Sequence, residues 1–184
     1  MKSLIGLALL LATASAAATP AVLDTRWTKS AALAYEDSSD AAKQARQLPE
    51  IRVYDRSNRL VLRKFGLKPG TVGRGIVQAV RGGAAVRGPS LAETLRELET
   101  RDGKPASAQV RGRGTVKVVD YWAEWCAPCK GLGVELEAWA ARQPQGAVQI
   151  VRAETDFIAA AEARGRKVLR YKRGPDGKLV KVDG

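Results

Sequence analysis

The sequence contains no histidine among its 184 residues, and this absence bears on several classes of function. Hydrolases that activate a serine or cysteine through an imidazole need a histidine as general base. Covalent haem attachment needs the pattern C-x-x-C-H, whereas Lys130 follows the second cysteine here. A zinc site typically takes four Cys or His ligands, so one built from this chain would depend on carboxylates. The composition therefore excludes histidine-dependent hydrolases and c-type haem proteins, and it disfavours a zinc protein.

Cysteine is almost as scarce, and its two copies, Cys126 and Cys129, form a C-x-x-C pair. A bridge across so short a loop removes little entropy from the unfolded chain, so it would be a poor structural staple. A C-x-x-C between a strand pattern and a helix pattern is typical of a dithiol redox motif. At a helix N-terminus, unpaired backbone N–H groups and the helix dipole stabilise a thiolate. We therefore expect Cys126 to be the nucleophile and Cys129, one turn later, to be the resolving thiol.

Acidic residues are outnumbered by basic ones, 19 to 31, which gives a formal net charge of +12. Such a charge favours anionic surfaces of any kind, including lipid head groups, cell-wall polymers, acidic proteins and nucleic acid. The basic residues are spread along the whole chain, without a basic block or an interleaved aromatic stripe. This distribution favours a solvated arginine-rich surface, and we expect no specific nucleic-acid partner.

Long hydrophobic runs are also lacking, and the most apolar stretch, Leu4 to Ala12, stands near the N-terminus behind Lys2. It is too short to span a bilayer as a permanent anchor. Small residues that suit cleavage follow it at 14–18, so the pattern predicts a signal peptide over residues 1–18. An N-terminal core helix is the alternative. We therefore expect an exported protein without a transmembrane anchor, located in the bacterial periplasm.

The rest of the chain alternates between strand and helix patterns. A capping box, Ser90-x-x-Glu93, predicts a helix through Leu98, and a flexible connector is expected over 104–114. The later elements expected are a buried strand over 115–122, a helix to about 143, a strand over 148–151, an Ala-rich helix over 157–164 and a hairpin of 168–172 with 178–182. The earlier elements expected are a loose lead-in over 19–30, a short strand over 31–35, a helix over 41–47, a hairpin of 51–54 with 60–63 and a helix over 71–80.

The segment V-D-Y-W-A-E-W-C-A-P-C-K at 119–130 resembles the active-site segment of the thioredoxin family, which usually has glycine at the position of Ala127. The resemblance is strong from Thr115 to Leu136. It implies an α/β thioredoxin-like fold, with a central mixed sheet flanked by helices, and places the CxxC domain at 84–184. It also implies thiol–disulfide exchange with protein substrates, without a cofactor. Similarity to periplasmic members implies a reductase that is recharged by a membrane thiol electron donor.

The same resemblance suggests roles for individual residues. Asp120 matches the family's buried carboxylate, which is implicated in proton transfer to and from the resolving cysteine. Burial would raise the pKa of this carboxyl toward neutrality, a useful setting for a general base. Trp125 matches the aromatic that family members use for packing and partner contact, while Ala127 and Pro128 would set the turn and flank the reacting sulfur.

One departure from the family concerns a proline. Family members place a cis-proline before the first strand of the terminal hairpin, facing the CxxC pair, but residues 165–168 contain none. Residues 33–52 can be laid over 151–170 at an offset of 118, with Glu36 on Glu154 and Arg52 on Arg170. This alignment puts Pro49 where the cis-proline would be. Residues 19–83 are thus an N-terminal β-hairpin and helix extension for which three explanations remain: a partial internal duplication forming a thioredoxin-like half module, a permuted completion of the catalytic sheet, or an unrelated addition.

Two functions of different class follow from these patterns. The first is a thiol–disulfide oxidoreductase that uses Cys126 and Cys129. The second is a basic thioredoxin-like binding or chaperone module in which the cysteines are not essential. The missing proline in 165–168 favours the second, because in the family that residue shapes the substrate groove.

Overall fold

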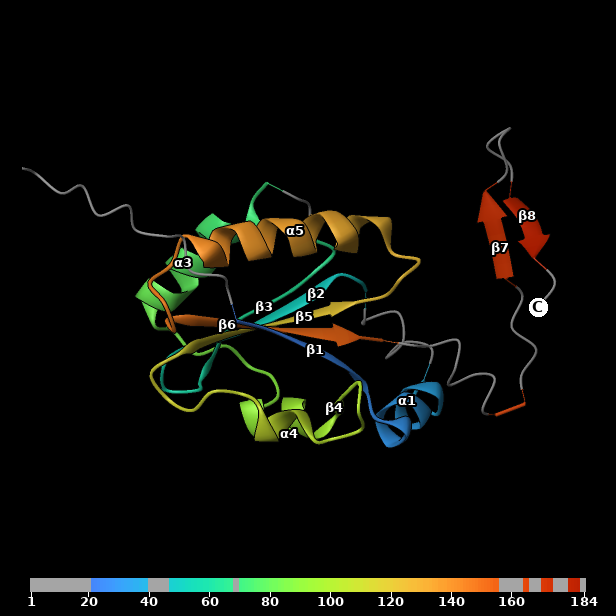
Figure 1. Cartoon of the computed structure of the whole chain (residues 1–184), viewed down its shortest axis with the longest axis horizontal. Helices are drawn as coiled ribbons and strands as arrows, with labels where there is room; N and C mark the ends of the chain where they lie inside the picture. The colour runs from blue at the N-terminus through green and yellow to red at the C-terminus, as the bar shows by residue number, and fades with distance from the viewer. Residues whose placement is uncertain are drawn as a thin grey trace, which may run out of the picture.

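A computed structural model describes residues 21–39, 47–67, 70–155, 164–165, 170–173 and 179–182. The expected signal peptide, most of the expected helix over 41–47 and almost all of the expected helix over 157–164 lie outside these residues. Within them the chain forms a mixed sheet with helices on both faces (Figure 1). This is the α/β architecture that the thioredoxin resemblance implies.

The main sheet has six strands in the order β3-β2-β5-β6-β1-β4. Pairs β1–β6 and β5–β6 are parallel, whereas β1–β4, β2–β3 and β2–β5 are antiparallel. The strands are β1 (Ala21–Trp27), β2 (Glu50–Tyr54), β3 (Leu60–Phe65), β4 (Leu98–Thr100), β5 (Val116–Trp122) and β6 (Val148–Glu154).

Helices α3 (Val72–Gly82) and α5 (Ala127–Ala141) cover one face of the sheet, and α4 (Leu91–Arg96) covers the other (Figure 1). The predicted core residues of α5, Leu132, Leu136 and Trp139, are buried against Val116, Val118 and the strands beside them. On the opposite face, Leu91 and Leu95 of α4 pack with Tyr54, Val119, Tyr121 and Val151. The site-bearing strand β5 is therefore buried on both faces.

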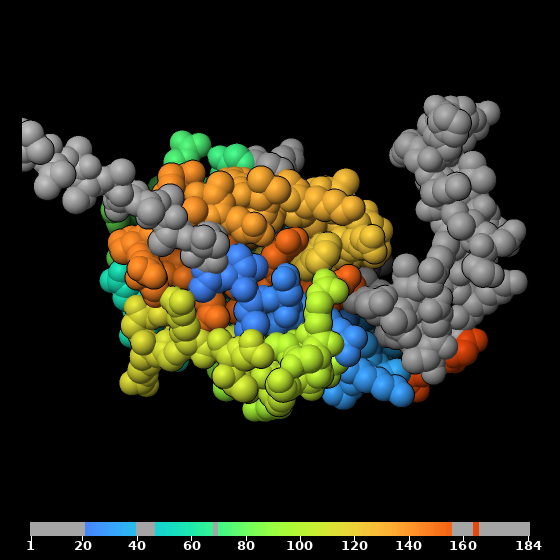
Figure 2. All heavy atoms as spheres, in the orientation of Figure 1, coloured from blue at the N-terminus to red at the C-terminus, as the bar shows by residue number. Residues whose placement is uncertain are grey.

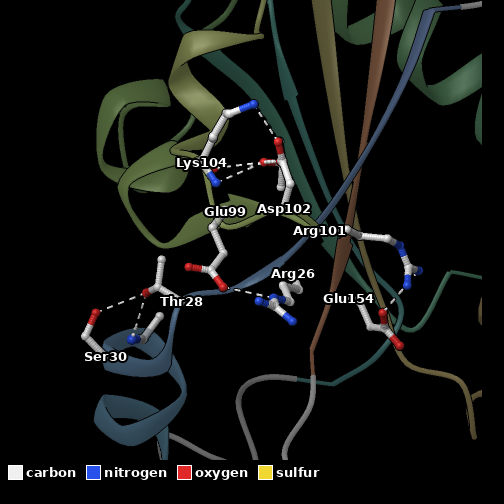
Figure 3. Close-up of polar contacts among 10 residues, drawn as sticks. Arg26, Thr28, Ser30, Glu99, Arg101, Asp102, Lys104 and Glu154 are labelled. Atoms are coloured by element: carbon white, nitrogen blue, oxygen red, sulfur yellow. Dashed lines mark hydrogen bonds and ion pairs between the residues drawn. The ribbon is translucent and has the colours of Figure 1, made fainter.

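The N-terminal part of the chain differs from its sequence-based prediction. Residues 21–27 are expected to be a loose lead-in, but they form β1, which pairs in parallel with β6 and antiparallel with β4. Arg26 Nε lies 2.9 Å from Glu99 Oε1 across the β1–β4 pair (Figure 3). The space-filling view shows β1, in blue, between α5 and the segment that contains α4 (Figure 2). The strand pattern is weak because only the second half of β1 contains buried side chains.

The expected strand over 31–35 is instead part of helix α1 (Lys29–Glu36). Thr28 caps this helix, since its Oγ1 accepts a hydrogen bond from the Ala31 backbone N–H at 3.1 Å. Ala31, Ala32 and Tyr35 pack against the cluster around α4. Alanine has the highest helix propensity of all residues, so the alanines of this segment favour the observed helix over the expected strand.

The domain boundary expected after residue 83 separates strands that belong to one and the same sheet. Strands β1, β2 and β3 come from residues 21–65, and strands β4, β5 and β6 come from residues 98–154. Ile51 of β2 lies opposite Asp120 of β5 in an antiparallel ladder. Residues 19–83 are therefore not an appendage to a separate CxxC domain, because their hairpin completes the sheet beside the CxxC-bearing strand. A hairpin beside β5 is what the permuted completion of the sheet, one of the three explanations, predicts.

The C-terminal hairpin lies outside the main sheet. Strands β7 (Arg170–Arg173) and β8 (Leu179–Val182) pair with each other, as the turn pattern predicts, and they form a two-stranded sheet of their own. The antiparallel partner of β5 is β2, which pairs with it along five residues.

The segment between the two halves also shows more structure than predicted. The capping box at Ser90 and Glu93 is present, as the sequence predicts. Helix α4 ends at Arg96, however, and Leu98 begins the short strand β4. The expected connector over 104–114 contains a 3₁₀ turn, η1 (Ala106–Ala108), whose first residue is buried.

Candidate active site

The two cysteines lie where β5 has ended and α5 begins. Cys126 is the N-cap residue of α5, and its Sγ accepts a hydrogen bond from the Cys129 backbone N–H at 3.3 Å. Pro128 is in the first turn, where its missing N–H leaves no gap in the helix. The two sulfurs are joined in a disulfide, with the Cα atoms 5.3 Å apart. The pair is thus in its oxidised form at the N-terminus of a helix.

The disulfide is buried beneath an exposed rim. Cys126 is 4% exposed and Cys129 is fully buried, and both pack with Ala123. Cys126 is thus the slightly more exposed residue of the pair. Trp125, Ala127 and Pro128 are exposed next to the pair, with Trp125 at 61%. These three residues, which the sequence suggests for substrate contact, form the accessible surface closest in sequence to Cys126.

The N-terminal half of the chain contributes to this site through Leu48 and Pro49. Leu48 packs against the cluster formed by Ala123, Cys126 and Cys129. Pro49 is buried, the Leu48–Pro49 peptide bond is cis, and β2 begins at the next residue. Glu50, that next residue, lies opposite Tyr121 of β5. The segment before β2 therefore lies beside the disulfide through Leu48. That Pro49 takes the part of the family's cis-proline stays a prediction.

Asp120 of β5 lies on the sheet face that α5 covers, as Val116 and Val118 do. Its side chain is fully buried, and neither carboxylate oxygen has a hydrogen-bond partner among the described residues. Burial raises the pKa of Asp120 to about 7. The cation Arg152 opposes this rise and the anion Glu137 adds to it. A buried carboxyl with such a pKa can take up or release a proton near neutral pH.

Arg152 is the residue near Asp120 that the sequence does not predict. It lies on β6, directly opposite Asp120 in the β5–β6 ladder. Its guanidinium stacks on the Trp122 ring, with the Cζ atom 4.6 Å from the ring centroid, and its Nη1 lies 3.6 Å from Glu137 Oε1. Gly133 of α5 lies close to it as well, because a Cβ there would lie 3.1 Å from Arg152 Nη2. The expected strand stops at Val151, one residue too early to include Arg152.

The described part of the chain shows no group of three or more His, Cys, Asp or Glu residues that could hold a metal ion. A search of those same residues for membrane-crossing helices found none that combines the necessary length and apolar character.

Comparison with known proteins gives a family-model match that contains this site. Residues 105–168 match the family model described as Thioredoxin. Mitochondrial thioredoxin of Mus musculus is 37% identical over 62 residues, covering 34% of this chain and 37% of the relative. Mitochondrial thioredoxin of Rattus norvegicus is 39% identical over 59 residues, covering 32% and 35%. The chain thus spans little more than a third of these relatives' length. The search of solved structures returned no match.

Proposed function

Because this chain belongs to the thioredoxin family through residues 105–168, we propose that it is a thiol–disulfide oxidoreductase acting on protein substrates. The observation that carries the proposal is the Cys126–Cys129 pair at the start of α5, packed by Leu48 from the neighbouring strand segment. Asp120, buried on the strand that leads to this pair and with its pKa raised to about 7, supports it further.

In the reducing direction the reaction begins with Cys126 as a thiolate. It attacks one sulfur of a substrate disulfide, so a mixed disulfide forms and the first substrate sulfur leaves as a thiolate that takes up a proton. Cys129 then passes its proton to the Asp120 carboxylate and attacks Cys126 Sγ. The mixed disulfide breaks, the second substrate thiolate leaves, and the Cys126–Cys129 disulfide closes. Two electrons have then passed from the chain to its substrate.

Insulin-disulfide reduction tests this proposal, with dithiothreitol as the source of electrons. We expect the wild-type chain to accelerate insulin precipitation and Cys126→Ser to reduce the rate to that of dithiothreitol alone. Cys129→Ser should accumulate a mixed disulfide with its substrate, visible as a non-reducing gel shift, because the resolving thiol is gone. Equal insulin rates in wild type and Cys126→Ser would rule out the oxidoreductase function.

Export to the periplasm and a membrane thiol donor are the finer parts of the proposal. They are supported by the Leu4–Ala12 apolar run with small residues after it, and by similarity to periplasmic reductases. Expression of the full chain in a Gram-negative host tests export. We expect a periplasmic product whose N-terminus, read by mass spectrometry, begins between residues 17 and 19. An unprocessed cytoplasmic product would contradict export.

The alternative is a basic thioredoxin-like binding or chaperone module. Its support from the sequence is the lack of a proline in residues 165–168. The packing of Leu48 on the cysteine cluster, with Pro49 directly after it, weakens that support, because this segment can form the groove wall that the missing proline would otherwise supply. No observed feature now favours the alternative over the oxidoreductase.

A further inference from the structure

The charged groups that act on Asp120 come from two elements. The acid Glu137 comes from α5, and Arg152 comes from β6, where it lies opposite Asp120. On β2, Ile51 lies opposite Asp120, whereas Arg52 bonds the Tyr121 hydroxyl on the other face of the sheet. The buried residues of α3 are apolar, and Lys130 at the start of α5 is exposed. Arg152 and Glu137 are therefore the fixed charges that act on Asp120 from its own face.

The Arg152 guanidinium forms no hydrogen bond with the Asp120 carboxyl, although the two residues lie opposite each other in the sheet. A cation opposite a buried carboxylate would ordinarily form a close ion pair, since both groups gain from it. Among the described residues, however, Asp120 has no hydrogen bond and Arg152 has its ion pair with Glu137. Arg152 Nε is itself buried without a partner. Arg152 is thus the neighbour of Asp120 in the β5–β6 ladder, but its guanidinium pairs with Glu137.

Three contacts hold the guanidinium in this position. The Trp122 ring lies against its face, 4.6 Å from centroid to Cζ. Glu137 pairs with Nη1 at 3.6 Å from the opposite helix. Gly133 of α5 leaves room for Nη2, since a Cβ there would lie 3.1 Å away. Trp122 is the last residue of β5, and Gly133 and Glu137 are one turn apart on α5, so the contacts link Arg152 of β6 to both β5 and α5.

We infer that Glu137 is a positioning residue, which with Trp122 holds the Arg152 guanidinium away from the Asp120 carboxyl and so keeps Asp120 a competent proton acceptor for Cys129. This rests on the proposed function, because it concerns the resolving step of the same site. A guanidinium bonded directly to Asp120 would stabilise the carboxylate and make it a weaker base. The negative charge of Glu137, whose side chain is 42% exposed, partly cancels the effect of the Arg152 cation on Asp120.

The test is the titration of Asp120 in the oxidised protein, in which neither cysteine titrates. The Asp120 carboxyl carbon is followed by ¹³C NMR across pH 4 to 9. Replacing Glu137 by Gln leaves Arg152 without its partner, so the Asp120 midpoint should fall by about half a unit or more. Glu135→Gln is the matched control, since Glu135 lies on the same helix but accepts hydrogen bonds from the Gly70 and Val72 backbone N–H groups.

Two further variants separate charge from structure. Glu137→Asp keeps the negative charge and should return the midpoint most of the way to the wild-type value. Arg152→Gln removes the cation and should raise the midpoint by about one unit. In single-turnover release of a substrate from its mixed disulfide, Glu137→Gln should shift the pH midpoint downward by the amount seen in the NMR titration.

An Asp120 midpoint that moves no further in Glu137→Gln than in Glu135→Gln would overturn the inference, as would an upward shift. A midpoint in Glu137→Asp as low as in Glu137→Gln would also overturn it, since the charge would not be the cause. Because the titration uses the oxidised protein without substrate, its outcome is independent of insulin reduction. Failure of this inference is thereby distinguished from failure of the oxidoreductase function.

Discussion

Asp120 gives the active site a base near neutral pH at a cost to the stability of the fold. Its folded-state pKa is raised from 3.8 to about 7, chiefly by burial. The folded protein therefore binds the Asp120 proton more tightly than the unfolded chain does. Between these two values the unfolded state binds fewer protons at this group, so the Asp120 contribution to stability falls as pH rises.

The first prediction concerns this stability. Asp120→Asn should remove the pH-dependent penalty, so its free energy of unfolding relative to wild type should increase from pH 4 to pH 7 by a few kcal/mol and then level off. Urea unfolding of the two oxidised proteins at a series of pH values measures the difference. A difference that stays constant with pH would mean that Asp120 has the same pKa in the folded and unfolded chains.

The second prediction concerns catalysis by the same variant. Asn cannot accept the Cys129 proton, so release of substrate from the mixed disulfide at pH 7 should slow by about tenfold or more. The wild-type rate should rise as pH increases through about 7, the pKa of Asp120, and this rise should be absent in Asp120→Asn. Stopped-flow measurement of the single-turnover rate checks both points. Cys126→Ser serves as the baseline, because it cannot form the intermediate.

The sequence indicates the residues of this site only where they are neighbours in the chain. Cys126, Cys129 and Asp120 lie in one short segment, where a strand pattern passes into a helix pattern. Arg152 is near Asp120 only because β6 pairs in register with β5, and its contacts with Trp122 and Glu137 come from two further positions. Such a cluster depends on the pairing of strands, which hydrophobic periodicity does not specify.

At the scale of elements, the contact between α3 and α5 depends on one glycine. A Cβ at Gly73 would lie 2.8 Å from Trp139 Cδ1, whereas Gly75 in the same helix has open space at the corresponding position. Trp139 is buried, so its ring has little freedom to move. The close approach of the two helices therefore requires glycine at position 73 but not at position 75.

The third prediction uses this pair of glycines. Gly73→Ala should destabilise the fold by about 1–3 kcal/mol, because the new methyl group overpacks the contact with Trp139. Gly75→Ala should instead stabilise it by about 0.5–1 kcal/mol through helix propensity alone. Chemical unfolding of both variants gives the comparison. Equal stabilisation by the two substitutions would show that α3 moves away from α5 at little cost.

Elements with strong local signals are predictable from the sequence, and those defined by tertiary pairing are not. The α5 core positions and the Ser90 capping box follow directly from residue spacing. Strand β1 has few buried side chains of its own and is specified by hydrogen bonding between β6 and β4, so it resembles a loop in sequence. Helix α4 ends early because Leu98 is recruited into β4 beside β1.

At the scale of the whole molecule, the sheet needs strands from both sides of residue 83. Without residues 21–65, β5 would lose its antiparallel partner β2, and β6 would lose its parallel partner β1. The apolar residues that pack against Ile51 and Val53 would also be exposed to water. Local sequence patterns cannot reveal this dependence, since they predict both hairpins and do not say which of them pairs with β5.

The fourth prediction is that residues 84–184 alone do not fold. We expect the fragment to show no cooperative urea transition by circular dichroism and no insulin reduction, because half of the six strands are missing. The full chain is the control. A fragment that folds and reduces insulin would mean that β7 and β8 can replace β2 and β3 beside β5.

The pairing of β1 with β6 also sets the order in which the molecule can be assembled. Asp24 lies opposite Arg152, so the first described strand must wait for a partner that is synthesised more than a hundred residues later. Contacts of such long sequence separation slow folding, because the loop they close must be ordered first. Strand β2, which begins two residues after Leu48, likewise waits for β5. On the ribosome, the N-terminal third of the chain is thus made early but can join its sheet only after the redox motif has emerged.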